Sequence, residues 1–256
     1  MKKSYFKLVS VFFFLFFVQG ILFSEKENIW QSFPPKTEYL AQAGIEKESV
    51  LAPDLMILGW GKNEYLAYFQ TYFIDGAGFY IFEWKIDNIK TQKTVWSLKD
   101  QYDGEDQLEG KNPAEPDFLK IYYSLKIKTV SKVLAKYKIN PQSQTDLLKP
   151  DSFQVSQNNF SVKTLVKMIY IKDFEWEQVK SYQITLNKGK LKKVILSKKS
   201  HQDEGLLDFK TAGVFISPDQ KYSAFLTLRM TRGYEGPPHD LSLNMVYTSL
   251  EKGFKK

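Results

Sequence analysis

The 256-residue chain contains no cysteine. It can therefore form no disulfide, bind no metal through thiolates and use no cysteine as a nucleophile. The same absence excludes the lipid-modified cysteine that anchors a bacterial lipoprotein. The folded protein must be held together by its core alone.

Histidine and arginine are nearly as scarce, with two residues of each. The histidines are His201, in a polar stretch, and His239, near the carboxyl end, so one chain cannot build a multi-histidine zinc site. The sequence also lacks a recognisable nucleophile elbow for a serine triad and a complete glycine-rich phosphate loop. We therefore predict no metal site and no cofactor.

Aromatic and apolar residues are plentiful: 16% of the chain is aromatic and 43% is hydrophobic. This is enough to bury a substantial core, and it argues against a disordered chain. Tyrosine and phenylalanine occur with valine and isoleucine in alternating runs, which suits the pleated, half-buried surface of a strand. The composition favours a mainly β fold.

Residues 1–24 are typical of an export signal. Three lysines give a positive start, an apolar run follows at residues 8–18, and the small residues Gly20 and Ser24 come next, with cleavage expected after Gly20. An uncleaved membrane anchor is the alternative, although the run is shorter than the roughly twenty residues that a spanning helix needs. In either case the lysines hold the N-terminus inside, and the rest of the chain is exported to the periplasm or beyond.

Export limits the expected partners. Nucleic acid is not expected outside the cytoplasm, and membrane contact is expected only through the N-terminal segment if it stays uncleaved. Removal of the signal takes away three lysines and lowers the formal charge from +7 to +4, which is a modest excess. The expected partner is an envelope protein or polymer.

After a polar lead-in at residues 25–54, residues 55–256 are predicted to form a single β-rich domain. Its first unit alternates apolar runs with glycine-containing turns and is predicted to be a meander, with strands at 55–58, 65–74, 79–86 and 94–98. Later strands are predicted at 162–172, 176–186 and 190–197. A short glycine-containing loop joins the last two as a hairpin.

Two segments 157 residues apart share an opening pattern, because YSAF at 222–225 aligns with YLAY at 65–68. Ser217-Pro218-Asp219, before the second copy, is similar to the strand opener in blades of secreted β-propellers, where proline fixes φ in the turn. A weaker third copy begins at Ser156. Because blades recur about every 40 to 45 residues, roughly half the spacing of these openers, we predict antiparallel propeller-like meanders in an incomplete propeller or sandwich.

The middle of the chain carries one helical pattern. Residues 100–117 form an acidic stretch whose spacing does not fit a calcium-binding loop, and a solvated loop is expected there. Pro116 then opens a pattern that predicts one amphipathic helix, inserted near 116–138 and packed on a sheet. Its apolar positions are Phe118, Tyr122, Leu125, Val133 and Tyr137.

The segment RGYEGPPHD, at 232–240, concentrates the side chains that offer chemistry. It follows Arg229 on a predicted strand and contains Arg232, Glu235, His239 and Asp240, and we predict these five as binding residues. A glycine- and proline-rich loop that presents an arginine fork suits recognition of a carboxylate or phosphate. In the structural alternative, Arg232 and Glu235 pair with each other or with a neighbouring strand to close the sheet.

This segment, with Ser217-Pro218 before its strand and Gly253-Phe254 after it, resembles the C-terminal signature of an uncharacterised family of predicted secreted bacterial proteins, a domain of unknown function. The resemblance covers about the last forty residues and, more loosely, residues 55–98. It implies export and a shared architecture, and it implies no particular chemistry.

Two functions stay open on the sequence. The leading hypothesis is a noncatalytic binding or scaffolding module of the periplasm or cell surface, which holds a partner through the C-terminal turn and aromatic-lined strand ends. The alternative is a hydrolase of envelope polymers that uses carboxylates such as Glu235 and Asp240, one of which would need a raised pKa. A flat, wide face favours the binder, and a cleft between two close carboxylates favours the enzyme.

Overall fold

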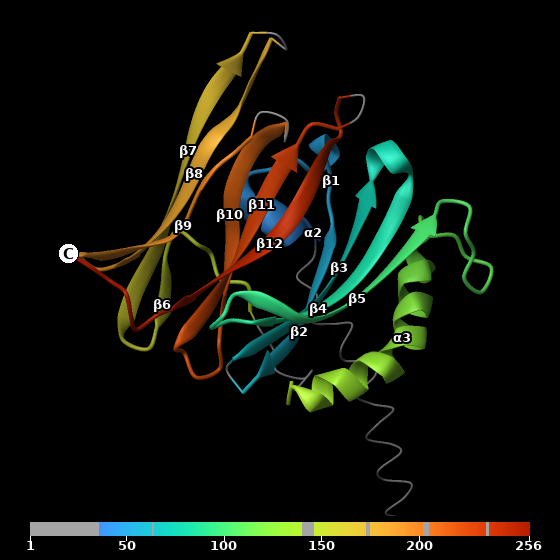
Figure 1. Cartoon of the computed structure of the whole chain (residues 1–256), viewed down its shortest axis with the longest axis horizontal. Coiled ribbons are helices and arrows are strands. Elements are labelled where there is room, and N and C mark those ends of the chain that lie inside the picture. Colours follow the sequence, from blue (N-terminus) through green and yellow to red (C-terminus); the bar gives the residue numbers. More distant parts are fainter. Residues whose placement is uncertain (1–35, 63, 140–145, 173–174, 202–204, 234–235) are drawn as a thin grey trace, which may run out of the picture. The chain divides into compact units, whose positions relative to one another are not determined.

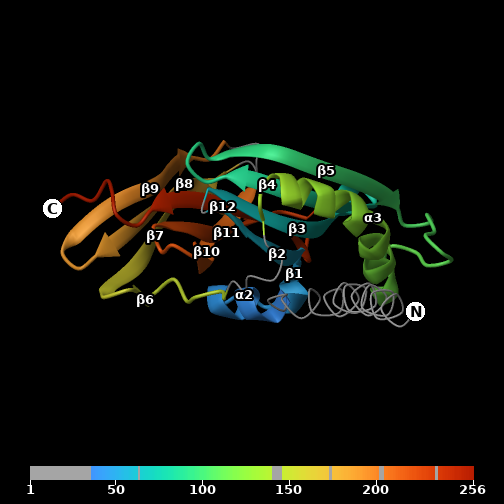
Figure 2. The same ribbon diagram turned by 90° about the horizontal axis from the view of Figure 1, so that it is seen from below.

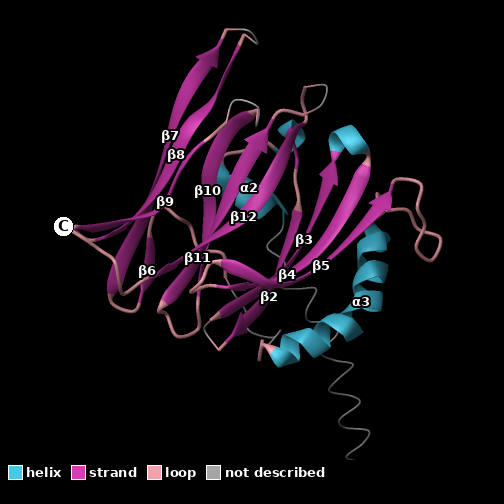
Figure 3. Ribbon diagram, in the orientation of Figure 1, coloured by secondary structure: helices cyan, strands magenta, loops and turns pink. Residues whose placement is uncertain are grey.

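The computed structural model describes residues 36–62, 64–139, 146–172, 175–201, 205–233 and 236–256 (Figure 1). The predicted export signal and the first part of the lead-in lie outside these ranges. Within the described part the chain is mainly β, with twelve strands in three four-stranded sheets. Figure 3 shows how strands dominate this part of the chain. The expectation of a mainly β fold is confirmed.

Two of the sheets are meanders, in which each strand pairs antiparallel with the next one along the chain. The N-terminal sheet consists of β2 (Asp54–Gly61), β3 (Tyr65–Ile74), β4 (Phe79–Asn88) and β5 (Lys93–Asp103). The middle sheet consists of β6 (Phe153–Val155), β7 (Asn158–Ile171), β8 (Trp176–Lys188) and β9 (Leu191–Lys199).

The third sheet, which we call the C-terminal sheet, brings together distant parts of the chain. Its antiparallel strands are β10 (Leu206–Ile216), β11 (Tyr222–Thr231) and β12 (His239–Ser249). The short strand β1 (Val50–Leu51) pairs in parallel with the start of β12, where Val50 lies opposite His239. Residues expected to form a lead-in thus contribute a strand beside the C-terminal turn.

The turn between β10 and β11 forms where the Ser-Pro opener predicts it. The backbone N–H of Gln220 donates to the carbonyl of Ser217 at 2.8 Å. The Ser217 hydroxyl donates to the Asp219 carboxylate at 2.7 Å and accepts the backbone N–H of Tyr222 at 3.0 Å. The serine side chain satisfies backbone and carboxylate groups that the turn would otherwise leave unpaired, which explains its place in the opener.

One face of the C-terminal sheet packs against the N-terminal sheet. Leu226 and Leu228 of β11 lie in one buried cluster with Leu55 and Ile57 of β2. The helix α2 (Lys36–Ala43) adds Tyr39 and its neighbours to the same cluster. Alternation along β11 directs every second residue into this core, as the period of a strand requires.

The opposite face of the C-terminal sheet packs against the middle sheet. Phe225 of β11 and Val214 of β10 share a buried cluster with Phe160 of β7 and Leu186 of β8. The C-terminal sheet is therefore covered on both faces. This explains why β11 has six consecutive buried residues instead of alternating buried and exposed positions.

The remaining face of the N-terminal sheet is covered by helix α3 (Pro116–Lys136). Phe118 and Tyr122 of the helix pack on Phe82 of β4, with ring centroids 5.3 and 4.6 Å apart. Figures 1 and 2 show α3 running beside β5. The predicted start at Pro116 and the packing on a sheet are confirmed.

The predicted apolar face of this helix is partly wrong. Leu125 is 49% exposed, whereas Tyr123, Val130 and Leu134 are buried. Tyr122, Val130 and Leu134 are separated by eight and four residues and so lie along one face of the helix, with Tyr123 beside it, whereas the exposed Leu125 lies off that face.

The described residues also include elements that the expectation of one central helix omits. These are α2 and two short 3₁₀ turns, η2 (Lys47–Ser49) and η3 (Asp75–Ala77). α2 stops at Ala43 because Gly44 adopts φ +62°, a conformation that ends helices. Among the described residues, none of the helices is long and apolar enough to cross a membrane.

Candidate functional site

The predicted residues Arg229 and Asp240 lie on one face of the C-terminal sheet. In the antiparallel pairing of β11 and β12, Arg229 lies opposite Ser242 and Thr231 lies opposite Asp240. Arg229 and Asp240 are therefore diagonal neighbours, within reach of a long side chain. Both residues are half-buried, with the Arg229 Nε and an Asp240 carboxylate oxygen shielded from solvent. They are the half-buried members of the predicted set.

Arg232 lies at the surface, one residue beyond the end of β11. Its guanidinium carbon lies 4.0 Å from the centroid of the Trp176 ring, which belongs to the first residue of β8. Its backbone N–H donates to the carbonyl of Gly205 at 3.1 Å. The ring supports one face of the guanidinium, while the N–H groups around its edge can donate hydrogen bonds. We call Arg232 and Trp176 the arginine platform.

The turn after Arg232 is packed too tightly for any residue but glycine at position 233. A Cβ atom there would lie 2.4 Å from the carbonyl oxygen of Gly236 and 2.5 Å from that of Pro238. Backbone oxygens cannot move aside as a flexible side chain can. The backbone carbonyls of Gly236 and Pro238 therefore lie close to Gly233, next in the chain to Arg232.

Of the other two predicted residues, only His239 lies in the described part of the chain, and it faces away from Asp240. His239 alternates with Asp240 on β12 and shares the strand face of Leu241, which packs toward the N-terminal sheet. Its Nδ1 lies 3.5 Å from the backbone nitrogen of Gly233. Glu235 lies outside the described residues, so its predicted pairing with Arg232 stays a prediction.

Sequence reasoning missed Trp176. It follows Glu175 and precedes Glu177, and an aromatic ring between exposed carboxylates at the start of a strand is unusual enough to draw attention. The pairing with Arg232 spans 56 positions of the chain, however, and no local pattern connects the two residues. The middle sheet and the C-terminal sheet must pack together before the platform exists.

The middle sheet carries a second feature, a basic outer face. Lys163 of β7 lies opposite Thr185, and Lys167 lies opposite Ser181, which in turn lies opposite Lys199 of β9. These positions alternate with the inward-facing core residues of the same strands. Lys163, Lys167, Lys192 and Lys199 are all exposed.

We call this surface the lysine face. In the described part of the chain it includes two exposed apolar side chains, Leu165 and Val194, and no acidic residue. Its positions are Ser161, Lys163, Leu165, Lys167, Ser181, Gln183, Thr185, Asn187, Lys192, Val194, Ser197 and Lys199.

Comparisons with protein-family models, with curated proteins and with solved structures find no match to this chain. The resemblance of the C-terminal segment to a family of secreted bacterial proteins therefore stays a prediction. The function must be argued from the site itself.

Proposed function

We propose that the protein is an exported, noncatalytic binding module that holds an anionic partner of the cell envelope. The observation that carries the proposal is the exposed Arg232 guanidinium stacked on Trp176. Stacking limits the freedom of a long side chain before any partner arrives, so less conformational entropy is lost on binding. A carboxylate or phosphate can then accept two parallel hydrogen bonds from the guanidinium edge.

The lysine face supports the same partner chemistry. It is a surface formed by three neighbouring strands, β7, β8 and β9, and its charges are all positive. Such a surface attracts extended polyanions over a distance of about one Debye length, roughly 8 to 10 Å at moderate salt. A wide basic face suits a binding or scaffolding role better than hydrolysis in a cleft.

We further propose that the sheets are propeller-like repeats in an incomplete stack. Tyr65 and Tyr222, which the 157-residue offset aligns, are the first residues of β3 and β11. The sheets stack in the order N-terminal, C-terminal, middle. Leu66, which follows Tyr65, faces the C-terminal sheet, and Ser223, which follows Tyr222, faces the middle sheet. Equivalent positions thus face the same way in two of the three sheets, as repeated blades require.

The binding proposal is tested with polyglutamate and polyphosphate as anionic probes and dextran as a neutral one. We expect the purified protein to bind both polyanions, with an affinity that falls as the salt concentration rises, and not to bind dextran. Arg232→Ala should weaken binding about tenfold, because a charge-assisted bidentate contact is lost. The affinity of Arg232→Lys should lie between those of the unchanged protein and Arg232→Ala, because lysine keeps the charge and loses the planar guanidinium that stacks on the ring.

Lys120→Ala is the matched control, because it removes one exposed positive charge from α3, far along the chain from the platform. An equal effect of Lys120→Ala and Arg232→Ala would reduce the binding to general charge attraction and overturn the role of the platform. Binding to dextran, or no binding to either polyanion, would overturn the proposal itself. Shortening of the polymers during incubation would favour the hydrolase.

A further inference from the structure

A cavity of about 460 Å³ lies beside the hairpin of β3 and β4. Its other walls come from the start of β2 and from the segment that leads into α3. Among the described residues, none of the predicted binding residues lines it. The volume falls in the range of about 300 to 1,000 Å³ that is typical of sites for small molecules.

Four of the described residues that line the cavity are aromatic. Tyr72 and Phe73 come from the end of β3, and Tyr80 comes from the start of β4. Phe73 and Tyr80 lie against each other with centroids 4.7 Å apart and planes inclined by 50°. These three residues are half-buried, and Phe82, the fourth aromatic residue of the lining, is buried.

Two carboxylates lie in the same wall, and among the described residues that line the cavity there is no lysine, arginine or histidine. Asp54, the first residue of β2, accepts a hydrogen bond from the hydroxyl of Thr71 at 3.2 Å. Glu115, the residue before α3, accepts hydrogen bonds from the Lys111 ammonium at 3.0 Å and from the backbone N–H of Asn112 at 3.1 Å.

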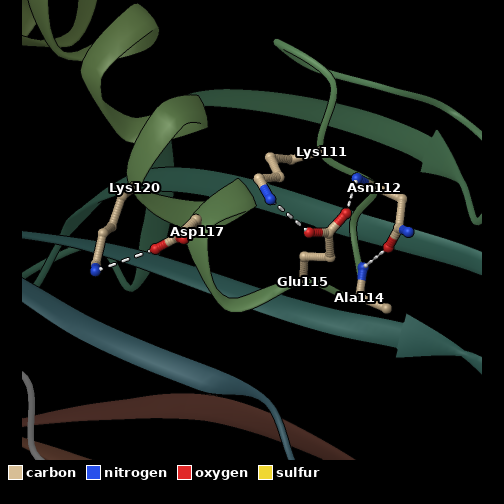
Figure 4. Close-up of polar contacts among 6 residues, drawn as sticks. All are labelled: Lys111, Asn112, Ala114, Glu115, Asp117 and Lys120. Atoms are coloured by element: carbon tan, nitrogen blue, oxygen red, sulfur yellow. Dashed lines mark hydrogen bonds and ion pairs between the residues drawn. The ribbon is translucent and has the colours of Figure 1, made fainter.

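Figure 4 shows how these contacts hold the Glu115 side chain in place. The backbone N–H of Asn112, followed by the Lys111 ammonium, lowers the pKa of Glu115 below its ordinary value. The carboxylate is therefore ionised at neutral pH. Lys111 offsets part of its charge from outside the cavity lining.

We propose that this cavity binds a small organic cation, with an ammonium head placed among the aromatic rings and beside the two carboxylates. Aromatic faces carry negative electrostatic potential and attract a cation within about 6 Å of the ring centroid. The carboxylates add attraction at long range, which the Lys111 ammonium offsets in part. A quaternary ammonium suits such a site, because its charge is spread over methyl groups that also pack on the rings.

Choline and its neutral isostere 3,3-dimethylbutan-1-ol are the probes, and titration calorimetry on the purified protein measures their affinity. We expect choline to bind at least about tenfold more tightly than the isostere, since the two differ in charge and hardly in shape. Asp54→Asn should weaken choline binding about fivefold or more. Lys111→Met should strengthen it, because the cation that competes for Glu115 is removed.

Asp117→Asn is the matched control, because Asp117 pairs with Lys120 on the first turn of α3 and does not line the cavity (Figure 4). It should leave choline binding unchanged. Tyr80→Leu tests the contribution of the aromatic ring separately, and it should weaken choline binding more than Tyr80→Phe does. Equal binding of choline and the isostere would overturn the proposal, as would tighter binding of glucose than of choline or the absence of saturable choline binding.

Discussion

At the scale of single residues, Asp87 is a buried carboxylate at the centre of a hydrogen-bond network. Its carboxylate accepts hydrogen bonds from the Tyr68 hydroxyl at 3.0 Å, the Tyr247 hydroxyl at 2.6 Å and the Thr94 hydroxyl at 2.7 Å. Asp87, Tyr68 and Tyr247 are all buried. A buried carboxylate is tolerated only where several donors replace the water it has lost. Tyr247 also connects this network of the N-terminal sheet to the C-terminal sheet.

Replacement of Asp87 by alanine should lower the free energy of unfolding by about 3 kcal/mol or more, because buried hydroxyls then lose their acceptor. Urea titration measures the change. Asp117→Ala removes an exposed carboxylate and should cost less than about 1 kcal/mol. Similar losses in the two variants would show that the buried network contributes no more than a surface charge.

At the scale of elements, close contacts at glycine explain how a segment outside the sheets is held. Residues before β6 run along β10, where the backbone groups of Leu148 and Val214 exchange two hydrogen bonds of 2.9 and 3.0 Å. The neighbouring Leu147 lies over Gly213, where a Cβ atom would be 2.0 Å from its Cδ1. Glycine is needed here for space, at a position where β10 also bulges.

Gly213→Ala should therefore destabilise the protein by about 1 to 3 kcal/mol, since Leu147 must leave its position on the core. The double variant Gly213→Ala with Leu147→Ala should lose less than the sum of the single variants, which urea titration of all three resolves. Gly104→Ala is the control, because a Cβ atom there meets nothing within 4 Å. Strict additivity of the pair would exclude a direct clash between the two side chains.

At the scale of the whole described chain, packing between the C-terminal and N-terminal sheets buries Tyr39, Tyr68 and Tyr247, and packing of α3 on the N-terminal sheet buries Tyr123. This burial creates a sensitivity to high pH. Burial raises the pKa of Tyr68 and Tyr247 well above the ordinary value, and burial also raises the pKa of Tyr39 and Tyr123. A nearby carboxylate also raises the pKa of Tyr39, Tyr68 and Tyr247. These phenols ionise more readily in the unfolded chain than in the folded one.

The consequence for stability has a definite sign. Below pH 10 these phenols are protonated in both the folded and the unfolded chain, so the stabilisation that they contribute is fully present. Above about pH 10 the unfolded chain loses the protons first, so stability falls by about 1.4 kcal/mol per pH unit for each such tyrosine. We expect the urea midpoint to drop sharply between about pH 9.5 and 11, with phenolate absorbance appearing together with unfolding. Phenolate absorbance from buried tyrosines in a folded protein would contradict this.

The sequence located most strands and the start of the central helix, because both signals are local. Val162 and Ile184 alternate with polar neighbours at the period of a strand, and Pro116 marks a helix start wherever it is followed by a helical pattern. Leu125 was assigned to the wrong helix face because spacing alone does not say which of two overlapping apolar stripes meets the sheet. Asp100 was expected in a loop but lies in β5, where its carboxylate accepts the Tyr122 hydroxyl at 2.6 Å.

In the candidate site, too, local features could be predicted from the sequence and contacts between distant residues could not. Arg232 was predicted as a binding residue because its glycine- and proline-rich turn concentrates charged side chains, and its binding role stays a prediction. Trp176 and the cavity beside Tyr80 were not found, because their partners are distant in the chain. The predicted carboxylate of Glu235 lies outside the described residues.

By itself, the amino-acid sequence determined the mainly β character of the chain, the helix that begins at Pro116 and the glycine-rich bend that follows Arg232. These features follow from backbone preferences and side-chain periods that act over a few residues. The tertiary structure alone decided which faces are buried, that Asp87 meets Tyr247 across 160 positions, and that Arg232 rests on Trp176. Contacts of this kind depend on how whole sheets stack, and stacking is set by the fit of many side chains at once.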